Sequence, residues 1–454
     1  MRIHFIAIGG AAMHNLALAL HQNGHQVSGS DDEIYNPARD RLAAAGLLPE
    51  AFGWHPEKIT PVLDAIVLGM HARPDNPELL RAQALNLPVF SYPAFMVEQA
   101  REKKRYVVAG SHGKTTTTAM AMHCLRKAGY DFDYLVGAQV QGFDTMVRLS
   151  EAPALLVEGD EYFASPLDHT PKMVRFKPHF AVITGIAWDH INVFPSFRDY
   201  VAQFDRLVEA IEPGGSLAWY ADDPELQQLV ARHTGGHWHS LAFSPFPARV
   251  EQGRTCVDLP GKEPAPLQIF GRHNLLNAKA ASLICRDFGM DEYEFLQHLS
   301  DFQGAAKRLQ LLAGSEHCQI WLDFAHAPSK VAATVSAVQQ QYPDRPLTAC
   351  LELHTFSSLN RDFLPQYAGS LDGADRAAVF YSPHTIEMKK LPAISVDEVR
   401  SAFKHPRLEV FTQKTALAEW LERQRWAARN LLLMSSGTFD GLDSHALAKR
   451  LCTP

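Results

Sequence analysis

The sequence predicts an α/β protein with three domains, each built on a mainly parallel sheet. Short apolar stretches typical of buried strands alternate with helical stretches along the chain, which is the pattern of strands joined by crossover helices. A charged run at residues 101–105 and a turn near Arg308 interrupt this alternation. The length of 454 residues fits two to four domains at about 100–200 residues each. We therefore expect a Rossmann-like domain at residues 1–104, a central mononucleotide-binding α/β domain at residues 105–310 and a second Rossmann-like domain at residues 311–454.

The composition narrows the class of protein. Hydrophobic residues make up 46% and charged residues 20% of the chain, as in ordinary globular proteins. No apolar run reaches the roughly 18 residues that a membrane helix needs, and the start, MRIHFIAIGG, lacks a secretory signal pattern. The 6 cysteines form no C-x-x-C pair, which argues against a zinc site or a disulfide framework and fits a reducing cytoplasm. The net charge of −7 disfavours nucleic acid as the main partner. We expect a cytoplasmic monomer or dimer whose partners are small molecules.

The first domain begins with a strand in IHFIAIGG, a glycine turn and a predicted helix at residues 12–23. Further strands are expected in HQVSGSD, which ends at Asp31, and in DAIVLGM at residues 64–70. Gly9 and Gly10 after one strand, with Asp31 at the end of the next, resemble a dinucleotide-binding turn. Alanines stand where the outer glycines of that pattern would be, so a nicotinamide cofactor is disfavoured. Another nucleotide-like ligand is favoured, and a turn that merely packs a helix on its sheet is the alternative.

The second domain opens with the stretch RYVVAGSHGKTTTTAM, in which an apolar strand ends in a glycine-rich turn. Gly113, Lys114 and Thr115 then open a predicted helix. Backbone N–H groups at such a helix start bind phosphate, the lysine adds a positive charge at the β- and γ-phosphates, and the hydroxyl can ligate Mg²⁺. The usual phosphate loop has a glycine where this chain has Val108, and the first glycine here is Gly110. We expect a nucleoside triphosphate at this loop, with ATP as the nucleotide.

Acidic residues follow two later strands of the second domain. Glu158, Asp160 and Glu161 end the apolar stretch ALLVEGD and begin the next segment, and a D-H pair ending at His190 follows HFAVITGI. The carboxyl ends of strands are where open α/β sheets bind ligands. Phosphoryl transfer needs oxygen ligands for Mg²⁺, so Glu158 with Thr115 could hold one ion and Glu158 with His190 a second. A histidine after a strand is more often structural, but the neighbouring loop and acids favour the ligand.

The remaining motifs lie around the junction with the third domain. GRHNLLN presents Asn274 and Asn277 at helical spacing, which suits the edge of an adenine, and an N-cap at Asn274 explains the motif equally well. FQGAAKRL supplies Arg308. Strands of the third domain are expected in QIWLDFAH, PLTACLEL and NLLLMSSGTFDG, and the first of them carries Asp323 and His326.

Taken in order, the motifs GSHGKTTTTAM, EGDE, DH, GRHNLLN, FQGAAKRL and DFAHAP resemble those of the Mur ligase family of bacterial cell-wall synthesis. The resemblance spans nearly the whole chain, from IGGAAM to MSSGTFDG. It accounts for the short loop, because the loop of this family reads G-x-x-G-K-T. The start of the chain and the phrase DNPEL are similar to the branch of the family that acts on UDP-N-acetylmuramate. In that branch the N-terminal domain binds the UDP-sugar, so the resemblance implies the same ligand at the IGGAAM turn.

The resemblance implies an ATP-dependent amide ligase that uses ATP and Mg²⁺. ATP would phosphorylate the lactyl carboxylate of the muramate, and an amine would displace phosphate from the acyl phosphate. Lys114 would neutralise the γ-phosphate, and Arg308 would also meet the phosphates. Asn274 and Asn277 would meet adenine, Asp323 the ribose, and His326 would lie beside the incoming amine.

The residues implied by the resemblance fall into four sets. The catalytic set is Lys114, Glu158, His190 and His326. The metal set is Thr115, Glu158 and His190. The ATP set is Gly110, Ser111, His112, Gly113, Lys114, Thr115, Thr116, Asn274, Asn277, Arg308 and Asp323. The UDP-sugar set is Gly9, Gly10, Ala11, Ala12, Met13, Ser30, Asp31 and His71.

Departures from the family pattern bear on the acceptor. Members that use free L-alanine typically carry two arginines in a P-H-R-Y-T-R phrase, and Thr355 and Ser358 stand in their places here. The closing stretch SGTFDG looks more like that of members that attach the tripeptide L-alanyl-γ-D-glutamyl-meso-diaminopimelate during peptidoglycan recycling. The expected reaction is therefore the joining of this tripeptide to UDP-N-acetylmuramate. The alternative is the joining of L-alanine in peptidoglycan synthesis.

Two more departures concern the metal site. Gly185, Ile186 and Ala187 replace an N-I-E phrase before the D-H pair, which removes a carboxylate. No lysine occurs between Lys177 and Lys262, so the carbamylated lysine that some branches use as a metal ligand is excluded.

An alternative from another class of function is a non-catalytic nucleotide-binding regulator, which would not need Glu158 and His190 together.

Overall fold

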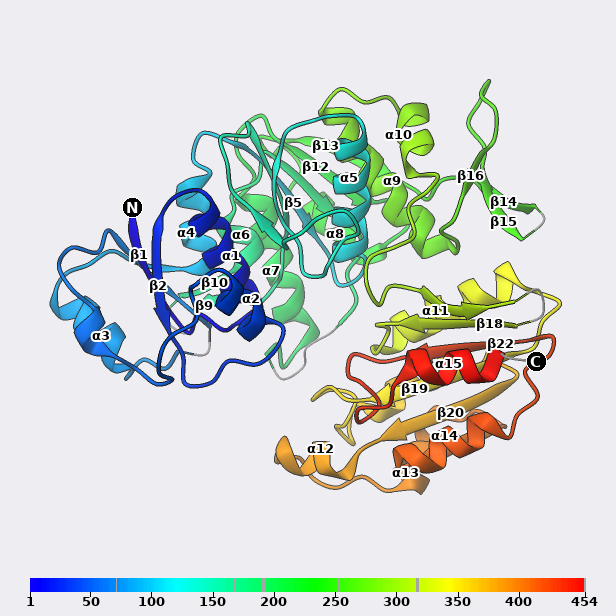
Figure 1. Ribbon diagram of the computed structural model, residues 1–454. Coiled ribbons are helices and arrows are strands. Elements are labelled where there is room, and N and C mark those ends of the chain that lie inside the picture. Colours follow the sequence, from blue (N-terminus) through cyan, green and yellow to red (C-terminus); the bar gives the residue numbers. More distant parts are fainter. Residues whose placement is uncertain (71, 166–167, 189–192, 252, 316–317, 453–454) are drawn as a thin grey trace.

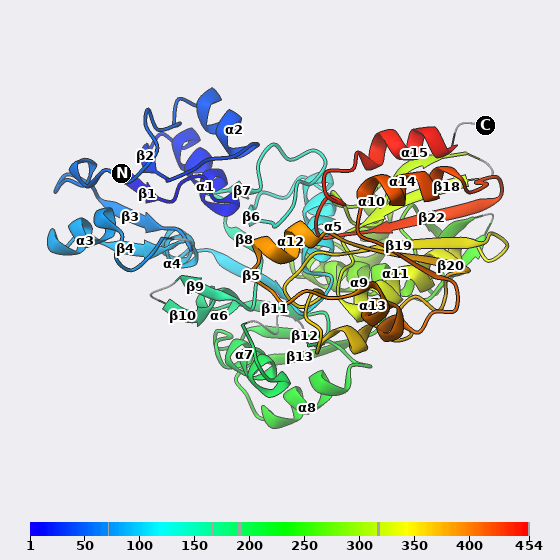
Figure 2. The same ribbon diagram turned by 90° about the horizontal axis from the view of Figure 1, so that it is seen from below.

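The computed structural model confirms the α/β class and the three-part organisation (Figure 1). It describes residues 1–70, 72–165, 168–188, 193–251, 253–315 and 318–452. A central unit, cyan to green, lies between an N-terminal unit in blue and a C-terminal unit in yellow to red (Figures 1 and 2). Within the described residues, the helices are too short or too polar to cross a bilayer.

The N-terminal unit is a four-stranded parallel sheet in the order β2-β1-β3-β4. The expected helix at residues 12–23 is α1, and its Leu16 packs on Ile3 and Phe5 of β1 in one apolar core. β1 ends at Ile6 because Ala7 adopts a left-handed backbone (φ 67°) and the chain turns there toward the start of α1. The elements are β1 (Arg2–Ile6), α1 (Ala11–Gln22), β2 (Gln26–Ser30), α2 (Ala38–Ala44), η1 (Pro56–Lys58), β3 (Ala65–Leu68), α3 (Pro77–Ala84), β4 (Val89–Ser91) and α4 (Tyr92–Gln99).

The central unit is a seven-stranded sheet in the order β13-β12-β11-β5-β8-β6-β7, and only the short edge pair β6–β7 is antiparallel among these described strands. β5 therefore has β11 on one side and β8 on the other, so three strand ends that carry chemistry lie next to one another. The elements are β5 (Lys104–Ala109), α5 (Lys114–Lys127), β6 (Asp133–Leu135), β7 (Val147–Arg148), β8 (Ala154–Glu158), α6 (Lys172–Arg175), β11 (Phe180–Ile183), α7 (Phe197–Glu209), β12 (Ser216–Tyr220), α8 (Pro224–Arg232), β13 (His239–Phe243), α9 (Arg272–Asp287) and α10 (Glu292–Leu299).

Two small antiparallel sheets are added to the central unit, and the sequence pattern did not predict them. The first is the pair β9 (Phe163–Ser165) and β10 (Asp168–Pro171). The second consists of β14 (Ala248–Glu251), β15 (Arg254–Val257) and β16 (Ala265–Leu267), and it extends beside the C-terminal unit in Figure 1. Gln341 joins this sheet to the C-terminal unit, because its amide nitrogen donates to the Gly253 carbonyl (2.7 Å) and its amide oxygen accepts from the Thr255 hydroxyl (3.2 Å).

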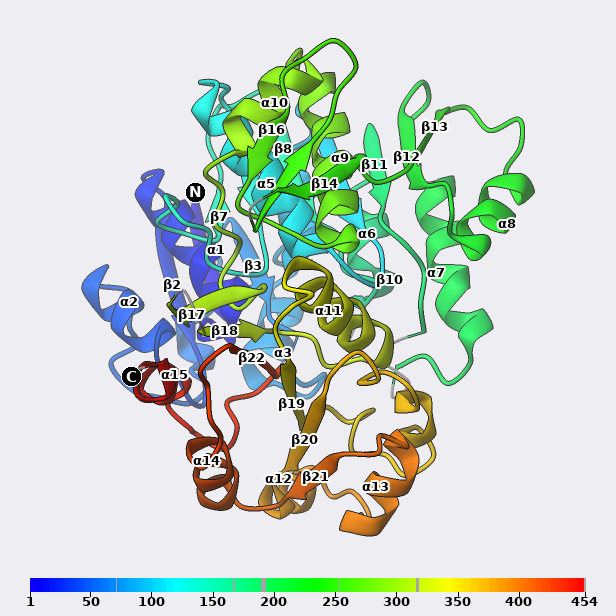
Figure 3. The same ribbon diagram turned by 90° about the vertical axis from the view of Figure 1, so that its right-hand side faces the viewer.

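The C-terminal unit is a six-stranded sheet in the order β17-β18-β22-β19-β20-β21. Its strands are parallel except for β17, an antiparallel edge strand that the Rossmann-like prediction did not include. Helix α11 faces α9 of the central unit (Figures 1 and 3). The elements are β17 (Gln310–Gly314), β18 (Cys318–Asp323), α11 (Pro328–Gln341), β19 (Leu347–Leu353), η2 (Leu364–Tyr367), β20 (Arg376–Tyr381), α12 (Pro383–Met388), α13 (Val396–Phe403), β21 (Leu408–Phe411), α14 (Lys414–Glu422), β22 (Arg429–Met434) and α15 (Ser444–Cys452).

Candidate active site

The predicted phosphate loop connects β5 to α5, at the carboxyl end of the central sheet. α5 begins at Lys114, and Gly113 before it has a left-handed backbone (φ 77°) and provides no side-chain cap. The first N–H groups of the helix are therefore oriented for an anion. A Cβ on Gly113 would collide with the Asn277 side chain, and one on Gly110 (φ 124°) would collide with Thr184. Both glycines are thus required by backbone conformation and by close neighbours.

Two hydrogen bonds hold the ammonium group of Lys114 beside this loop. It donates to the Gly110 carbonyl (2.8 Å) and to the Glu161 carboxylate (2.9 Å), and the lysine side chain is only 12% exposed. Burial by itself lowers the pKa of Lys114, but Glu161, Asp160 and Glu158 outweigh it and raise the pKa above its ordinary value. The lysine is therefore a fixed positive charge at the start of the helix.

Oxygen ligands suited to Mg²⁺ lie next to the lysine. The Thr115 hydroxyl donates to one oxygen of Glu158 (2.7 Å), and the other oxygen of Glu158 accepts from the Gly137 N–H (2.7 Å). Burial raises the pKa of the Glu158 carboxyl, and the charge of Asp160 raises it further. The Arg308 guanidinium reaches the Thr115 hydroxyl at 3.4 Å. A threonine hydroxyl beside a glutamate is a hard oxygen pair of the kind that Mg²⁺ prefers.

The second metal ligand expected from the sequence, His190, lies outside the described residues. Among the residues that the structure describes, no group of three or more His, Cys, Asp or Glu side chains is arranged to hold a metal ion. The pair formed by Thr115 and Glu158 would therefore have to be completed by water, by phosphate oxygens or by groups beyond the described part of the chain.

These groups line a cavity of about 450 Å³ between the central and C-terminal units. Its walls carry both signs of charge: carboxylates come from Glu158, Asp160, Asp223 and Asp323, and cationic side chains come from Lys114, Arg308 and Lys330. A triphosphate is strongly negative, so a divalent cation bound to it would reduce its repulsion from the carboxylates, and the cationic side chains would offset more of its charge. The charge of the wall thus fits a metal–nucleotide complex.

Asp323 and His326 approach the cavity from the carboxyl end of β18. Both carboxylate oxygens of Asp323 accept backbone N–H groups, one from Leu309 and one from Ala325, each at 2.6 Å. Asp323 therefore fixes the segment that carries Arg308. Contact between Asp323 and the ribose stays a prediction. The His326 ring is 7% exposed, and its Nδ1 lies 2.9 Å from the Phe324 carbonyl. Because a carbonyl only accepts, Nδ1 carries the proton in the neutral ring and Nε2 is the basic nitrogen.

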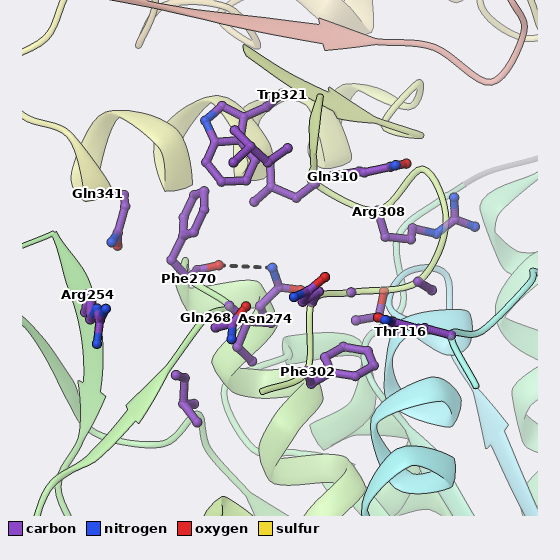
Figure 4. A pocket seen from close by; sticks show the side chains of 18 of the residues that line it. Thr116, Arg254, Gln268, Phe270, Asn274, Phe302, Arg308, Gln310, Trp321 and Gln341 are labelled. Atoms are coloured by element: carbon purple, nitrogen blue, oxygen red, sulfur yellow. Dashed lines mark hydrogen bonds between the residues drawn. The ribbon is translucent and has the colours of Figure 1, made fainter. Parts of the chain in front are cut away.

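The two asparagines lie on α9, but they differ in environment. The N-cap of α9 is Gly271, and Asn274 is the third residue of the helix, so the N-cap alternative for Asn274 is wrong. Its amide nitrogen donates to the Phe270 carbonyl (3.0 Å), as Figure 4 shows. Asn277 lies one turn further and touches Gly113 of the phosphate loop. Asn277 therefore lies against the loop, and contact of the two amides with adenine stays a prediction.

A second cavity, of about 840 Å³, shares lining residues with the first, and Figure 4 shows side chains that line it. Thr116, Asn274, Arg308 and Leu309 line both cavities. The edge of Phe270 faces the Trp321 ring at a centroid distance of 5.0 Å. The two cavities thus meet at these shared residues, between the central and C-terminal units.

The N-terminal turn lies in a separate part of the molecule. The Gly9 N–H donates to Asp31 Oδ2 (2.7 Å), and burial raises the pKa of Asp31 to about 6 despite that bond. Gly10 provides no side-chain cap for α1, whose first turn has no acidic residue, so the first N–H groups of the helix can donate hydrogen bonds to an anion. The other residues expected here are Ala11, Ala12 and Met13 at the start of α1, the fully buried Ser30 at the end of β2, and His71, which lies outside the described residues.

The structure adds site residues that the sequence did not identify. Glu161, recognised in the sequence only as one of three acids, is the ion-pair partner of Lys114. Tyr200 of α7 contacts both Ser111 (2.8 Å) and Glu161 (3.3 Å). His112 of the loop contacts Ser329 at the start of α11 (2.7 Å). The acid run EGDE was a signal for Glu161, whereas nothing in the sequence connected Tyr200 with a loop about ninety positions earlier.

Comparisons with known proteins match most of the chain. The family model described as Mur ligase family, catalytic domain, matches residues 2–104, and the Mur ligase middle domain matches residues 108–285. The UDP-N-acetylmuramate–L-alanine ligase of Mycobacterium marinum is 31% identical over 405 residues, which is 83% of this chain and 80% of that protein. Further curated relatives, 27–31% identical, carry the same enzyme name.

Two solved structures are also similar to this chain. The UDP-N-acetylmuramate:L-alanyl-γ-D-glutamyl-meso-diaminopimelate ligase from Neisseria meningitides is 28% identical with a TM-score of 0.60, over 66% of this chain and 98% of that one. A murein peptide ligase from Psychrobacter arcticus has a TM-score of 0.65 at 23% identity, over 100% of this chain and 99% of that one. At that identity the second likeness supports the fold alone.

Proposed function

Because the chain belongs to the Mur ligase family, whose members are ATP-dependent amide ligases, we propose that it activates the lactyl carboxylate of UDP-N-acetylmuramate and joins it to an amine. The observation that carries this proposal is the cavity in which the phosphate loop, Glu158, Arg308 and His326 meet. We propose domain limits of 1–104 for the UDP-sugar, 105–310 for ATP and 311–454 for the amine, as expected from the sequence.

The first step would be phosphoryl transfer. A carboxylate oxygen attacks the γ-phosphorus of ATP, the bond from that phosphorus to the bridging oxygen breaks, and ADP leaves. The ammonium of Lys114 and the guanidinium of Arg308 lie on the wall where these oxygens would bind and would balance their charge. The product is an acyl phosphate, which has a good leaving group where the carboxylate had none.

Mg²⁺, bound by Thr115 and Glu158, would supply charge neutralisation at the phosphate oxygens. The oxygen ligands on these two residues, 2.7 Å apart, fit the metal, and so does the excess of carboxylates around the cavity. His190 stays a sequence prediction for this role.

The second step would be amide formation. The amine attacks the carbonyl carbon of the acyl phosphate, a C–N bond forms, and phosphate leaves with the electron pair of the broken C–O bond. A proton must leave the nitrogen during this step. Nε2 of His326, the basic nitrogen of a ring whose Nδ1 is engaged by the Phe324 carbonyl, is the group that we propose to accept it.

The acceptor has two candidates. The curated relatives reported above are named as L-alanine ligases, so by name they favour L-alanine over the tripeptide that the sequence motifs predict. The solved structure at 28% identity is named as the tripeptide ligase. Judged by the names of the relatives alone, L-alanine is the better supported acceptor.

The turn after β19 supports the tripeptide as the acceptor. Thr355 and Ser358 stand where two arginines are expected in an L-alanine ligase. The Thr355 N–H donates to the Ser358 hydroxyl (2.9 Å) and the Ser358 N–H donates to the Thr355 hydroxyl (3.1 Å), so these two side chains close the turn on itself. A free amino acid presents a carboxylate that an arginine binds best, whereas the alanine of the tripeptide has no free carboxylate. We propose the tripeptide as the acceptor on this ground, with L-alanine as the second candidate.

The choice is testable in one assay. We expect kcat/KM for the tripeptide to exceed that for L-alanine at least about a hundredfold, or roughly 2.7 kcal/mol, in phosphate release with saturating ATP and UDP-N-acetylmuramate. L-alaninamide is the matched control, because it is the size of alanine but lacks the carboxylate. Equal or better turnover with free L-alanine would contradict the tripeptide and assign the L-alanine reaction.

A further inference from the structure

A chain of hydrogen bonds behind the phosphate loop links helix α7 to Lys114. The Ala187 N–H donates to the Ser111 hydroxyl at 2.8 Å. The Ser111 hydroxyl contacts the Tyr200 hydroxyl at 2.8 Å, and that hydroxyl contacts Glu161 Oε1 at 3.3 Å. The other oxygen of Glu161 accepts from the Lys114 ammonium at 2.9 Å.

Simple donor and acceptor rules fix the direction of this chain. Glu161 is ion-paired with Lys114 and, as a carboxylate, only accepts, so Tyr200 must donate its hydroxyl proton to Glu161. Tyr200 then has no proton left for Ser111, so Ser111 donates to Tyr200. Ser111 in turn accepts from the Ala187 N–H. Every hydroxyl proton in this series of hydrogen bonds is therefore directed toward Glu161.

The three side chains in the middle of this series of hydrogen bonds are buried, and Ala187 and Lys114 at its ends are half-buried. Tyr200 and Glu161 are both 0% exposed and Ser111 is 4% exposed. Buried hydrogen bonds to a charged group are strong and directional, because no water can replace a lost partner. Tyr200 contacts one oxygen of Glu161 and Lys114 contacts the other, so both residues help to hold the orientation of this carboxylate.

We propose that Tyr200 is a positioning residue for ATP-dependent turnover: it orients Glu161, which holds the Lys114 ammonium at the phosphate loop. Lysine has a flexible stem, so an ammonium that must meet a transferring phosphoryl group needs a fixed partner. The same chain holds the Ala187 backbone, which precedes the Asp189–His190 pair in the sequence. The proposal rests on ATP use by the family and applies with either acceptor.

The test is Tyr200→Phe, which removes one oxygen atom and keeps the ring. We expect kcat to fall about tenfold, as for a small misplacement of a reacting group, while KM for ATP changes less than about twofold. Tyr106→Phe is the matched control. Tyr106 is also buried in the central unit, and its hydroxyl also donates to a carboxylate, that of Asp287 (2.7 Å), at a distance from the loop. The control should keep wild-type kcat even where its melting temperature falls.

A double-mutant cycle separates positioning from a general loss of stability. Glu161→Gln is expected to lower kcat about a hundredfold, and adding Tyr200→Phe should lower it less than about threefold more, because both act through the same carboxylate. If Tyr200→Phe does not fold, Ser111→Ala interrupts the chain from the loop side and should lower kcat about fivefold. The proposal is overturned by wild-type kcat in Tyr200→Phe or in Ser111→Ala, or by losses that multiply in the double variant. Turnover is measured with whichever acceptor the wild-type protein uses, so a wrong acceptor assignment would leave this test intact.

Discussion

Replacing Lys114 with alanine is expected to lower kcat for ligation about a thousandfold or more. The ammonium is fixed between Gly110 and Glu161 at the start of α5, where a γ-phosphate would bind. Alanine removes that charge from a cavity that already has an excess of carboxylates, so the phosphoryl group in transfer loses its nearest balancing charge. The measurement is phosphate release at saturating ATP, Mg²⁺ and both substrates.

The matched control is Lys127→Ala, at the opposite end of the same helix. Lys127 pairs with Asp301 on the surface (2.9 Å), and such a pair contributes about 0–1 kcal/mol to stability. We expect the control to retain full activity. A Lys114→Ala protein that remains within tenfold of wild type would contradict the role proposed for the lysine. Circular dichroism on both variants separates a loss of chemistry from a loss of fold.

Replacing Glu158 with glutamine is expected to raise the Mg²⁺ concentration for half-maximal activity at least about tenfold and to lower kcat at saturating Mg²⁺. The two oxygens of Glu158 accept from Thr115 and from Gly137, so a glutamine must turn its NH₂ group toward one of these donors. The variant therefore loses the negative charge, and it keeps both hydrogen bonds only if its NH₂ group donates to the Thr115 hydroxyl, which would then accept instead of donate. The measurement is a Mg²⁺ titration of activity at fixed ATP.

Glu151→Gln is the control for this experiment. Glu151 precedes the same strand, β8, but is exposed, so its charge is screened by solvent. Its Mg²⁺ titration should overlay that of the wild-type protein. Unchanged titration curves in the Glu158 variant would remove Glu158 as a proposed metal ligand.

The parts of the site that could be predicted are those whose residues lie in one short stretch of the sequence. The loop from Gly110 to Thr115 was recognisable because a strand, a glycine turn and a helix follow one another and the chemistry depends on that local order. Asn274 and Asn277 were recognisable because a helix places residues three apart on one face. The α/β class followed in the same way from the alternation of apolar strands and helices.

Contacts between distant segments were not predictable. Tyr200 on α7 contacts Glu161, which follows β8, only in the folded chain, and the sequence alone does not show which helix lies beside which strand end. The antiparallel strand β17 and the sheet of β14 to β16 were missed because they are short and their alternation is weak. The N-cap alternative for Asn274 failed because Gly271, with a left-handed backbone (φ 87°), starts the helix earlier.

In the proposed reaction, ATP phosphorylates the carboxylate of UDP-N-acetylmuramate before the amine attacks. Its most direct test is turnover with UDP-N-acetylmuramate labelled with ¹⁸O in the lactyl carboxylate, followed by mass analysis of the phosphate released. The acyl phosphate route transfers one carboxylate oxygen to phosphorus, so each phosphate should carry one labelled oxygen at full enrichment. Release of unlabelled phosphate, or equal release in the absence of UDP-N-acetylmuramate, would contradict the account.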